Sequence, residues 1–354
     1  MRKTTVLHCI ASPFWGGGER YVYDLASQML ADGYRIIVYS PDNQILKKQF
    51  SKLETYPDFS FAQRKKTFAA NLLNLIHIIE SQQVDVVHIH NTKTLLTAAL
   101  AKTFSSRKFR LVLSIHLVKK SKNNFIRKWE TSKVDKLVFV SRLAAETYLK
   151  DSDIHKDKVN VVWNSILAPV ASPVAVPQLE PALCFVGRLA PEKGIDTILE
   201  AMGKTESHCR LNIVGNGEQN YVDMLKQKAA QLNISDRVDF IGFTTDTDRY
   251  IVNSLFGVLP SSAPESFGLA NLEFMRCGKT QITSNNGAQK EYLSDEVTAL
   301  LIEPENPALL AEKIDFLIQN PQKCKEMGKN AKDFFEKELS YEHFYKKILK
   351  IYED

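Results

Sequence analysis

The sequence has little cysteine, and its few cysteines are scattered. Among 354 residues there are five, and no two stand in C-x-x-C spacing: Cys9, Cys184, Cys209, Cys277 and Cys324. Such spacing argues against a zinc or iron–sulfur site and against a disulfide framework. We expect all five to be reduced packing residues.

Long apolar runs are also missing. No stretch approaches the roughly 20 apolar residues that a membrane span requires. The N-terminus has a basic start and an apolar run, but the run is too short for a signal peptide, and Thr4 and Thr5 favour a first β-strand. We therefore expect a cytoplasmic protein.

A dinucleotide-binding motif is absent as well. No G-x-G-x-x-G with an acidic residue about 20 positions later follows the first predicted strand, which disfavours a dehydrogenase. No short repeat or low-complexity segment is present. The hydrophobic fraction of 44% and the charged fraction of 25% are those of an ordinary globular protein.

Strand-like and helix-like segments alternate along the whole chain. Parallel strands need crossover connections, so this alternation predicts an α/β fold with helices on both faces of parallel sheets. The predicted strands are Thr4–Ile10, Arg35–Ser40, Val84–His90, Arg110–Ile115, Lys136–Val140, Ala182–Val186, Arg210–Val214, Val238–Ile241, Gly257–Pro260 and Thr280–Ser284.

A proline-rich segment divides this alternation into two halves. In LAPVASPVAVPQLEP a proline recurs at every fourth residue, which excludes a continuous helix or a central strand. A chain of this length is expected to form about two domains. We predict a Rossmann-like domain over 1–166, a linker over 167–181, a second Rossmann-like domain over 182–338, and a C-terminal helix over 339–354 that packs back on the first domain.

The net charge of +5 is modest but unevenly distributed. Eleven Lys and Arg residues lie in segment 102–136, against only Glu130 and Asp135. Such a segment can be simply a solvated face. Alternatively, it attracts anionic lipid headgroups or a phosphorylated lipid-linked ligand, with each nearby cation contributing about 1 kcal/mol at a membrane surface.

The strongest chemical feature is the segment APESFGLANLEFMRCGK, residues 263–279. It follows a predicted strand and places Glu265 in a loop and Glu273, after seven intervening residues, in a helix. The amides of Gly268 and Leu269 would form the start of that helix, where unpaired N–H groups and the positive end of the dipole suit a diphosphate. Taken alone, the two glutamates are better interpreted as solvated carboxylates that the helix dipole favours.

Two cations stand in a second strand-to-helix connection, FVGRLAPEKGIDTILEA. Arg188 offers a planar fork to phosphate oxygens, and Lys193 offers a compact charge. Together they could hold a pyrophosphate leaving group and stabilise its growing charge. The combination of cations and carboxylates favours a ligand site over surface charges.

These motifs, in this order, resemble the retaining glycosyltransferase family 4 with the GT-B fold, over almost the whole chain. The resemblance rests on Gly16–Glu19, His116, Val140–Ser141, Asn164, Gly187–Arg188, Lys193–Gly194, Gly215–Asn216–Gly217 and the Glu265/Glu273 pair. It implies two Rossmann-like doubly wound parallel-sheet domains that face each other across a cleft, with an acceptor-binding domain over 1–166 and a nucleotide-sugar donor-binding domain over 182–338.

The resemblance also assigns roles to single residues. Arg188 and Lys193 bind the donor diphosphate, Glu273 holds the ribose hydroxyls, and Glu265 contacts the transferred sugar. His116 lies near that sugar as the active-site histidine. The residues that line the donor are Gly17, Gly18, Gly187, Gly215, Phe267, Gly268 and Leu269.

The implied activity is retaining, metal-independent hexosyl transfer from a nucleotide sugar, with UDP or GDP as the carrier, to a glycan or lipid-linked acceptor of surface polysaccharide or lipopolysaccharide. Front-face displacement then needs no dedicated protein base and no cofactor. Ser266, Ala288 and Ala299 replace glycines that are common in the family, and Leu117 replaces a frequent aspartate. These departures leave the sugar preference open. The competing interpretations are a nucleotide-sugar epimerase and a two-lobed sugar-binding protein.

Two patterns suggest a metal superficially. His88 and His90 alternate on a strand, but with no third ligand nearby we expect packing residues. Asp246 and Asp248 match the Asp-x-Asp pattern of metal-dependent transferases, yet they precede a helix, where aspartate is a preferred N-cap. We therefore predict no metal site. We also expect no contact with nucleic acid.

Overall fold

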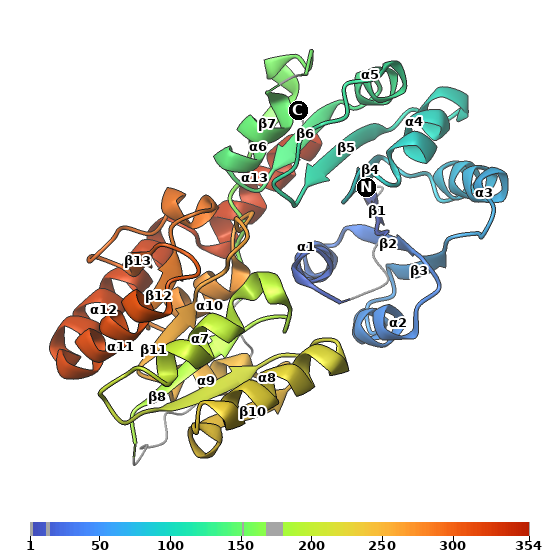
Figure 1. Ribbon diagram of the computed structural model, residues 1–354. Coiled ribbons are helices and arrows are strands. Elements are labelled where there is room, and N and C mark those ends of the chain that lie inside the picture. Colours follow the sequence, from blue (N-terminus) through green and yellow to red (C-terminus); the bar gives the residue numbers. More distant parts are fainter. Residues whose placement is uncertain (1–2, 12–14, 151, 168–179, 354) are drawn as a thin grey trace. The chain divides into compact units, whose positions relative to one another are not determined.

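The computed structural model describes residues 3–11, 15–150, 152–167 and 180–353 (Figure 1). Most of the predicted linker 167–181 therefore lies outside the described residues. By its internal contacts the chain divides into two units. The first domain comprises Met1–Asn164 and Glu342–Asp354, and the second domain comprises Ser165–Tyr341.

The described part of the first domain contains a seven-stranded sheet in the order β3-β2-β1-β4-β5-β6-β7, and all its strand pairs are parallel. Its strands are β1 (Thr5–Cys9), β2 (Arg35–Ser40), β3 (Phe59–Gln63), β4 (Val86–Ile89), β5 (Arg110–Ile115), β6 (Lys136–Phe139) and β7 (Val159–Val161). Its helices are α1 (Gly17–Ala31), α2 (Gln44–Phe50), α3 (Phe68–Ser81), α4 (Leu95–Phe104), α5 (Phe125–Ser132) and α6 (Arg142–Leu149), with short 3-10 turns η1 (Ser51–Leu53) and η2 (Lys156–Lys158).

The described part of the second domain repeats the design with six parallel strands in the order β10-β9-β8-β11-β12-β13. Its strands are β8 (Ala182–Val186), β9 (Arg210–Val214), β10 (Val238–Gly242), β11 (Phe256–Leu259), β12 (Gln281–Ser284) and β13 (Leu300–Ile302). Its helices are α7 (Ile195–Met202), α8 (Gln219–Gln231), α9 (Thr247–Val252), α10 (Leu269–Arg276), α11 (Pro307–Gln319) and α12 (Pro321–Glu338), with 3-10 turns η3 (Pro191–Lys193), η4 (Ser235–Arg237) and η5 (Ala288–Glu291).

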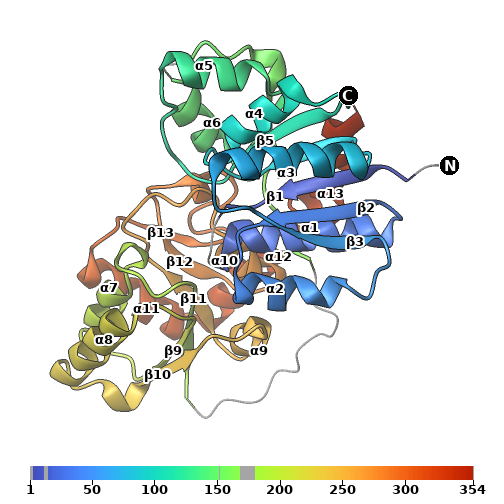
Figure 2. The ribbon, with the colours of Figure 1, turned by 90° about the vertical axis from the view of Figure 1, so that its right-hand side faces the viewer.

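The central strands are apolar because helices cover both faces of each sheet, as Figure 2 shows for the two domains. Every residue of β1, β4, β8, β11 and β12 is buried. In the second domain one core cluster joins these strands to α7 and α11 through residues such as Phe185, Ile198 and Ile314. Two doubly wound parallel-sheet domains, the predicted architecture, are confirmed.

Three short strands are absent from the sequence-based prediction: β3, β7 and β13. All three lie at sheet edges. The strands β3 and β7 have no fully buried residue, and β7 and β13 are only three residues long. Edge strands of this kind lack the continuous apolar run by which a buried parallel strand is recognised.

The C-terminal helix α13 (Tyr341–Glu353) packs against the first domain from its first turn to its last. The hydroxyl of Tyr352 lies 2.6 Å from Nδ1 of His88 on β4, and the guanidinium of Arg110 on β5 donates to the carbonyl of Ile351 at 2.9 Å. The ring of Phe344 meets Tyr21 of α1 edge-on, with centroids 5.2 Å apart. The helix thus completes a domain that begins at the other end of the chain.

Among the described residues, no helix combines the length and the apolar character that crossing a membrane would require.

Candidate functional site

The predicted donor residues gather at one edge of the second sheet. Gly187 and Arg188 follow β8, Gly215 follows β9, and Glu265 lies in the loop after β11. The strand order reverses between β8 and β11, because β8 pairs with β9 on one side and with β11 on the other. Ligands of open α/β sheets bind outside the carboxyl ends of the strands at such a switch point.

Lys193 and Glu265 form the centre of this edge. The Nζ atom of Lys193, in η3, lies 2.6 Å from Oε1 of Glu265, and both side chains are about three-quarters buried or more. The hydroxyl of Ser261 donates to the same carboxylate oxygen at 2.6 Å. A cation held in this way, yet partly open to solvent, is placed to meet an anionic ligand.

Arg188 is positioned differently from Lys193. Its guanidinium pairs with the carboxylate of Glu192, four residues on, and its side chain is 67% exposed. The backbone of Glu192 is fixed, since its carbonyl accepts from the amide of Ser262 at 3.0 Å. Arg188 therefore lies on the surface beside the Lys193–Glu265 pair, and it must leave Glu192 in order to bind a phosphate with both arms of its fork.

The helix α10 begins beside Glu265, where the sequence predicts it. Its N-cap is Gly268, whose φ of +87° belongs to the left-handed region, and a Cβ there would lie 2.6 Å from Nδ2 of Asn271. The hydroxyl of Tyr292 donates to the carbonyl of Phe267 and accepts from Asn271 at 3.0 Å. This network fixes the turn that presents the backbone amides at the start of α10, those of Leu269 included.

The side chain of Phe267 is buried and packs on Tyr292, with ring centroids 4.7 Å apart. Any contact between Phe267 and a phosphate would therefore come from its backbone. Glu273 is half-buried one turn into α10. It faces β8. Burial there raises the pKa of the Cys184 thiol, and the charge of Glu273 raises it further.

Two glycines allow the strand ends to approach each other. A Cβ on Gly215, whose φ is +144°, would lie 1.8 Å from the carbonyl oxygen of Gly187. The amide of Gly187 in turn donates to Val214 at 3.0 Å. The connection that carries Arg188 is therefore packed directly against the end of β9.

The remaining predicted site residues belong to the first domain. Gly17 and Gly18 form the first turn of α1, after Gly16 as N-cap, so they start a helix and are not part of a free loop. His116 directly follows β5 and is half-buried. The ring of Tyr21, from α1, packs edge-on against the ring of His116, with centroids 4.8 Å apart.

The expectation that His88 and His90 lack a third metal ligand nearby is wrong. His8 pairs with His88 in the register of β1 and β4, and one nitrogen from each of His8, His88 and His90 lies within 4.8 Å of the others. The sequence separates His8 from this pair by 80 residues, and only the parallel pairing of β1 with β4 brings them together. That no metal is required stays a prediction.

The expected role of Asp246 and Asp248 also needs correction. Asp246 is the N-cap residue of α9, but its side chain makes no capping hydrogen bond. Asp248 is buried and forms an ion pair with Arg276 of α10. Its carboxylate therefore joins two helices of the second domain.

Sequence reasoning missed Ser261, Tyr292 and Asn271. All three support site residues through hydrogen bonds to Glu265 or to the start of α10. Ser261 could have been found, because it follows a predicted strand by one residue and precedes Glu265 by four. Tyr292 gives no such signal, since its place beside Phe267 depends on the fold of η5.

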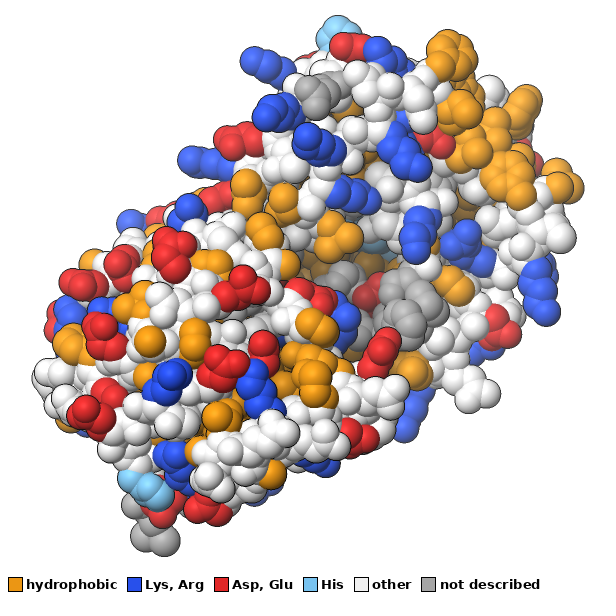
Figure 3. Space-filling model, viewed as in Figure 1, with side chains coloured by type: hydrophobic (Ala, Val, Ile, Leu, Met, Phe, Trp, Pro, Cys, Tyr) orange, Lys and Arg blue, Asp and Glu red, His pale blue; other side chains and the backbone are white. Residues whose placement is uncertain are grey.

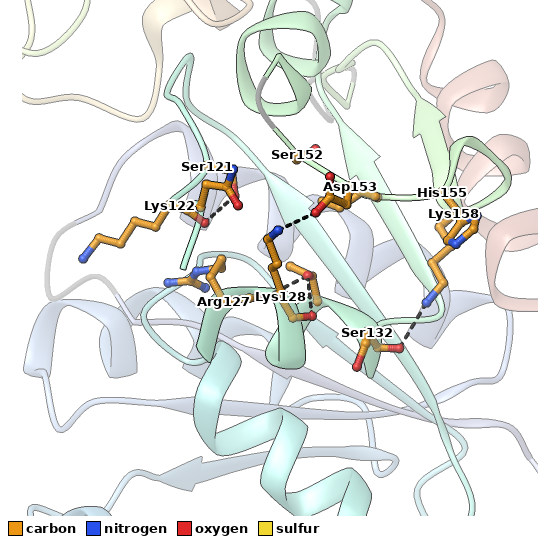
Figure 4. Close-up of a pocket in the computed structure, with 12 residues that line it drawn as sticks. Ser121, Lys122, Arg127, Lys128, Ser132, Ser152, Asp153, His155 and Lys158 are labelled. Carbon is orange, nitrogen blue, oxygen red and sulfur yellow. Dashed lines mark hydrogen bonds and ion pairs between the residues drawn. The ribbon is translucent and has the colours of Figure 1, made fainter. Parts of the chain in front are cut away.

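A cavity of about 250 Å³ lies elsewhere, in the first domain between α5 and the segment before β7 (Figure 4). Its walls are rich in basic groups, among them Lys122, Arg127, Lys128 and Lys158. Lys128 reaches the carboxylate of Asp153, and Lys158 donates to the carbonyl of Ser132 at 3.1 Å. Part of the basic segment 102–136 thus surrounds a hollow.

Two family models match the chain. Residues 15–166 match the model described as Glycosyltransferase Family 4, and residues 173–334 match the model described as Glycosyl transferases group 1. Together the two models cover most of both domains.

Similar proteins and structures agree with these models. An uncharacterised glycosyltransferase of Methanocaldococcus jannaschii is 26% identical, over 97% of this chain and 95% of that protein. The structure of Anabaena HepE in complex with UDP-glucose superposes with a TM-score of 0.83 at 20% identity, over 98% of both chains. WaaG, described as a glycosyltransferase involved in lipopolysaccharide biosynthesis, superposes with a TM-score of 0.72 at 15% identity, over 98% of this chain and 99% of WaaG. The GT-B fold is thereby confirmed.

Proposed function

Because the chain belongs to the glycosyltransferases, with a family 4 domain followed by a group 1 domain, we propose that it transfers a hexose from a nucleotide diphosphate sugar. The nucleotide is UDP or GDP. The observation that carries this proposal is the largely buried pair of Lys193 and Glu265 at the switch point of the second sheet, beside the start of α10. The likeness to a UDP-glucose complex supports a hexose on a nucleoside diphosphate.

In this proposal Lys193 and Arg188 bind the diphosphate, together with the backbone amides at Gly268 and Leu269. Lys193 is held for this task by Glu265, which contacts the sugar with its remaining carboxylate oxygen. Glu273, further along α10, binds the ribose hydroxyls. Because Gly187 and Gly215 have no side chains, the ligand can approach the backbone closely at the ends of β8 and β9.

Transfer proceeds with retention and without a metal. The acceptor hydroxyl attacks from the side on which the nucleotide departs, and the leaving phosphate oxygen takes its proton. The bond from the anomeric carbon to that oxygen breaks as the new bond forms. Lys193 and Arg188 stabilise the charge that develops on the diphosphate, which lowers the barrier because this charge is largest in the transition state.

The acceptor is a glycan or a lipid-linked glycan of surface polysaccharide or lipopolysaccharide, bound on the first domain with His116 and the start of α1. The likeness to WaaG supports this class of acceptor. We place the enzyme on the cytoplasmic side of the membrane, in peripheral contact through the basic segment 102–136.

A panel of UDP, GDP, ADP and CMP sugars tests the donor. We expect one UDP or GDP sugar at 100 times its Kd to stabilise the second domain by about 2.7 kcal/mol and to raise its Tm by about 5–10 °C. With the matching donor and an acceptor, NMR of the product should show the anomeric configuration of the donor. EDTA should leave the rate unchanged.

Each part of the proposal has its own contrary result. A panel without any nucleotide-dependent shift would remove the donor assignment. An epimerised sugar nucleotide formed from the donor alone would identify an epimerase, and an inverted product would exclude front-face retention.

The membrane contact rests on apolar side chains that accompany the cations. Phe125, Ile126 and Leu117 are 83%, 59% and 61% exposed, and Figure 3 shows Lys and Arg side chains over the end of the first domain that holds α5. Several cations of the segment are already paired, for example Arg107 with Asp85 and Lys128 with Asp153. The remaining cations alone therefore supply only part of the attraction to an anionic membrane. The exposed apolar side chains near α5 supply the rest by entering the membrane interface.

Replacing both Lys120 and Lys122 with glutamate should lower binding to vesicles containing anionic phospholipid about 30-fold or more, since each of the two cations contributes about 1 kcal/mol. Replacing both Phe125 and Ile126 with serine should lower it at least about fivefold, because these apolar side chains then no longer enter the membrane interface. Co-sedimentation with vesicles measures the effect. The matched control reverses Lys47 and Lys48 on α2, at the opposite end of the same domain (Figures 1 and 2). Equal losses in control and test variants, or no loss in either, would rule out a contact through α5.

A further inference from the structure

Three histidines of the first domain form a hydrogen-bonded row that ends at His116. Nδ1 of His8 lies 3.0 Å from Nε2 of His90, and Nδ1 of His90 lies 3.3 Å from Nε2 of His116. The three residues stand on or directly after β1, β4 and β5. We call His8, His90 and His116 the histidine row. It runs from the interior of the sheet to the predicted active-site residue.

The chemistry of imidazole restricts how such a row can be protonated. A neutral imidazole has one N–H donor and one bare acceptor nitrogen, so two neutral arrangements satisfy both hydrogen bonds. In the first, each ring donates toward His116, whose Nδ1 then carries its proton. In the second, each ring donates toward His8, whose Nε2 then carries a proton.

The inner end of the row favours the first arrangement. Nε2 of His8 is buried and has no hydrogen-bond partner among the described residues. In the second arrangement this atom would be a buried N–H without an acceptor, and such donors are rarer in proteins than under-satisfied acceptors. The first arrangement leaves only a bare nitrogen there.

The surroundings keep the row uncharged. Burial lowers the pKa of His8 to about 3 and that of His116 to about 4, in the latter case with a contribution from the charge of Lys119. Burial also holds the pKa of His90 well below its usual range, assisted by its histidine neighbours. Tyr21 of α1 contacts His90 and His116 edge-on, and Lys119, whose Nζ donates to Thr92 at 3.0 Å, is the cation whose charge acts on His116.

His88 stands beside the row without belonging to it. Its Nδ1 is 2.6 Å from the hydroxyl of Tyr352, and its Nε2 is 2.7 Å from that of Ser114. Both of its nitrogens are therefore occupied, and a metal held by His8, His88 and His90 would have to displace one hydrogen bond of His88 and one of His90. Hydrogen bonding therefore explains the close approach of these histidine nitrogens better than a metal site does.

We propose that His90, with His8 behind it, is a positioning residue that holds His116 as a neutral imidazole protonated on Nδ1. His90 donates a hydrogen bond to Nε2 of His116, so only Nδ1 of His116 is left for a ligand. Nδ1 of His116 then donates to a hydroxyl oxygen of the sugar or of the acceptor. This inference rests on the proposed glycosyl transfer, in which His116 touches the substrate.

Two substitutions of His90 separate positioning from packing. The amide of asparagine reaches the place of Nδ1 and can donate to His116, whereas the longer glutamine reaches the place of Nε2 and faces His8. Removing the outer partner of a functional imidazole at metal sites costs about 10- to 100-fold in activity, and we expect a fall of that size in kcat for His90→Gln, with the KM for donor little changed. His90→Asn should stay within about threefold of the wild-type kcat.

The matched control is His88→Gln. It alters a histidine of the same strand that is equally buried but makes no hydrogen bond to His116. It should lower Tm and leave kcat close to the wild-type value. Equal losses of kcat for His88→Gln and His90→Gln, or a loss for His90→Asn as large as that for His90→Gln, would overturn the positioning role.

Nitrogen NMR of histidine-labelled wild-type protein tests the row without any substitution and without activity. His116, assigned with the variant His116→Ala, should remain neutral and protonated on Nδ1 from pH 5 to 8, whereas free histidine in water favours the other tautomer. A His116 that titrates near the ordinary pKa of 6.5, or that is protonated on Nε2, would overturn the proposal even if the enzyme is active. Absence of transfer with every donor, with the tautomer as expected, would instead overturn the proposed function.

Discussion

Replacing Lys193 with methionine is expected to lower kcat by about 10²- to 10³-fold, the loss found when one donor to a developing negative charge is removed. Lys193 is a largely buried cation at the switch point, 2.6 Å from Glu265. Methionine keeps the length and the apolar stem of the side chain. The rate of transfer at saturating donor, measured for both proteins, gives the effect.

The chain offers a close control for this substitution. Lys228, on α8 of the same domain, also pairs with a glutamate, Glu200, and its side chain is 26% exposed, as is that of Lys193. Lys228→Met should leave kcat within about twofold, because an ion pair at a partly exposed site contributes only about 1 kcal/mol or less to stability. If the two variants lose activity equally, Lys193 does not act on the leaving group.

Replacing Gly215 with alanine is expected to destabilise the second domain by about 3 kcal/mol and to lower its Tm by about 6–12 °C. The added Cβ would lie 1.8 Å from the carbonyl oxygen of Gly187, and the φ of +144° is one that side chains disfavour. Since the strand end cannot move without moving Gly187 and Arg188, donor binding should weaken as well. Thermal melting with and without the nucleotide measures both effects.

Gly242→Ala separates the two causes of this loss. Gly242 accepts from the amide of Gly215 at 2.9 Å and has a φ of +80°, but a Cβ there would meet nothing within 4 Å. Only the backbone preference is then lost, which costs about 1–2 kcal/mol. A Gly215→Ala protein as stable as the Gly242→Ala protein would show that the strand ends are not in close contact.

The sequence predicts the fold well where burial on both sides of a strand leaves a continuous apolar run. The runs of β1, β8 and β11 have this character and are found to within two residues. The edge strands β3, β7 and β13 are missed because their residues are half-exposed or too few. Local pattern thus identifies the centre of each sheet and loses its margins.

For the site, the sequence identifies the residues and the structure supplies their partners. Lys193 and Glu265 stand 72 positions apart, and the strand order brings them within 2.6 Å. The pairing of Arg188 with Glu192 was not predicted, although a spacing of four residues allows it. The histidine row could not be predicted, because its members belong to three separate strands.

The route of the chain has a consequence for its synthesis. The second domain is one continuous stretch, Ser165–Tyr341, whereas the first needs residues from both ends. Tyr352 and Ile351, which bond to β4 and β5, are synthesised only after the whole second domain. The second domain is therefore complete before the first, because the first domain waits for α13. In most proteins the N-terminal domain folds first during translation, and here that order is reversed.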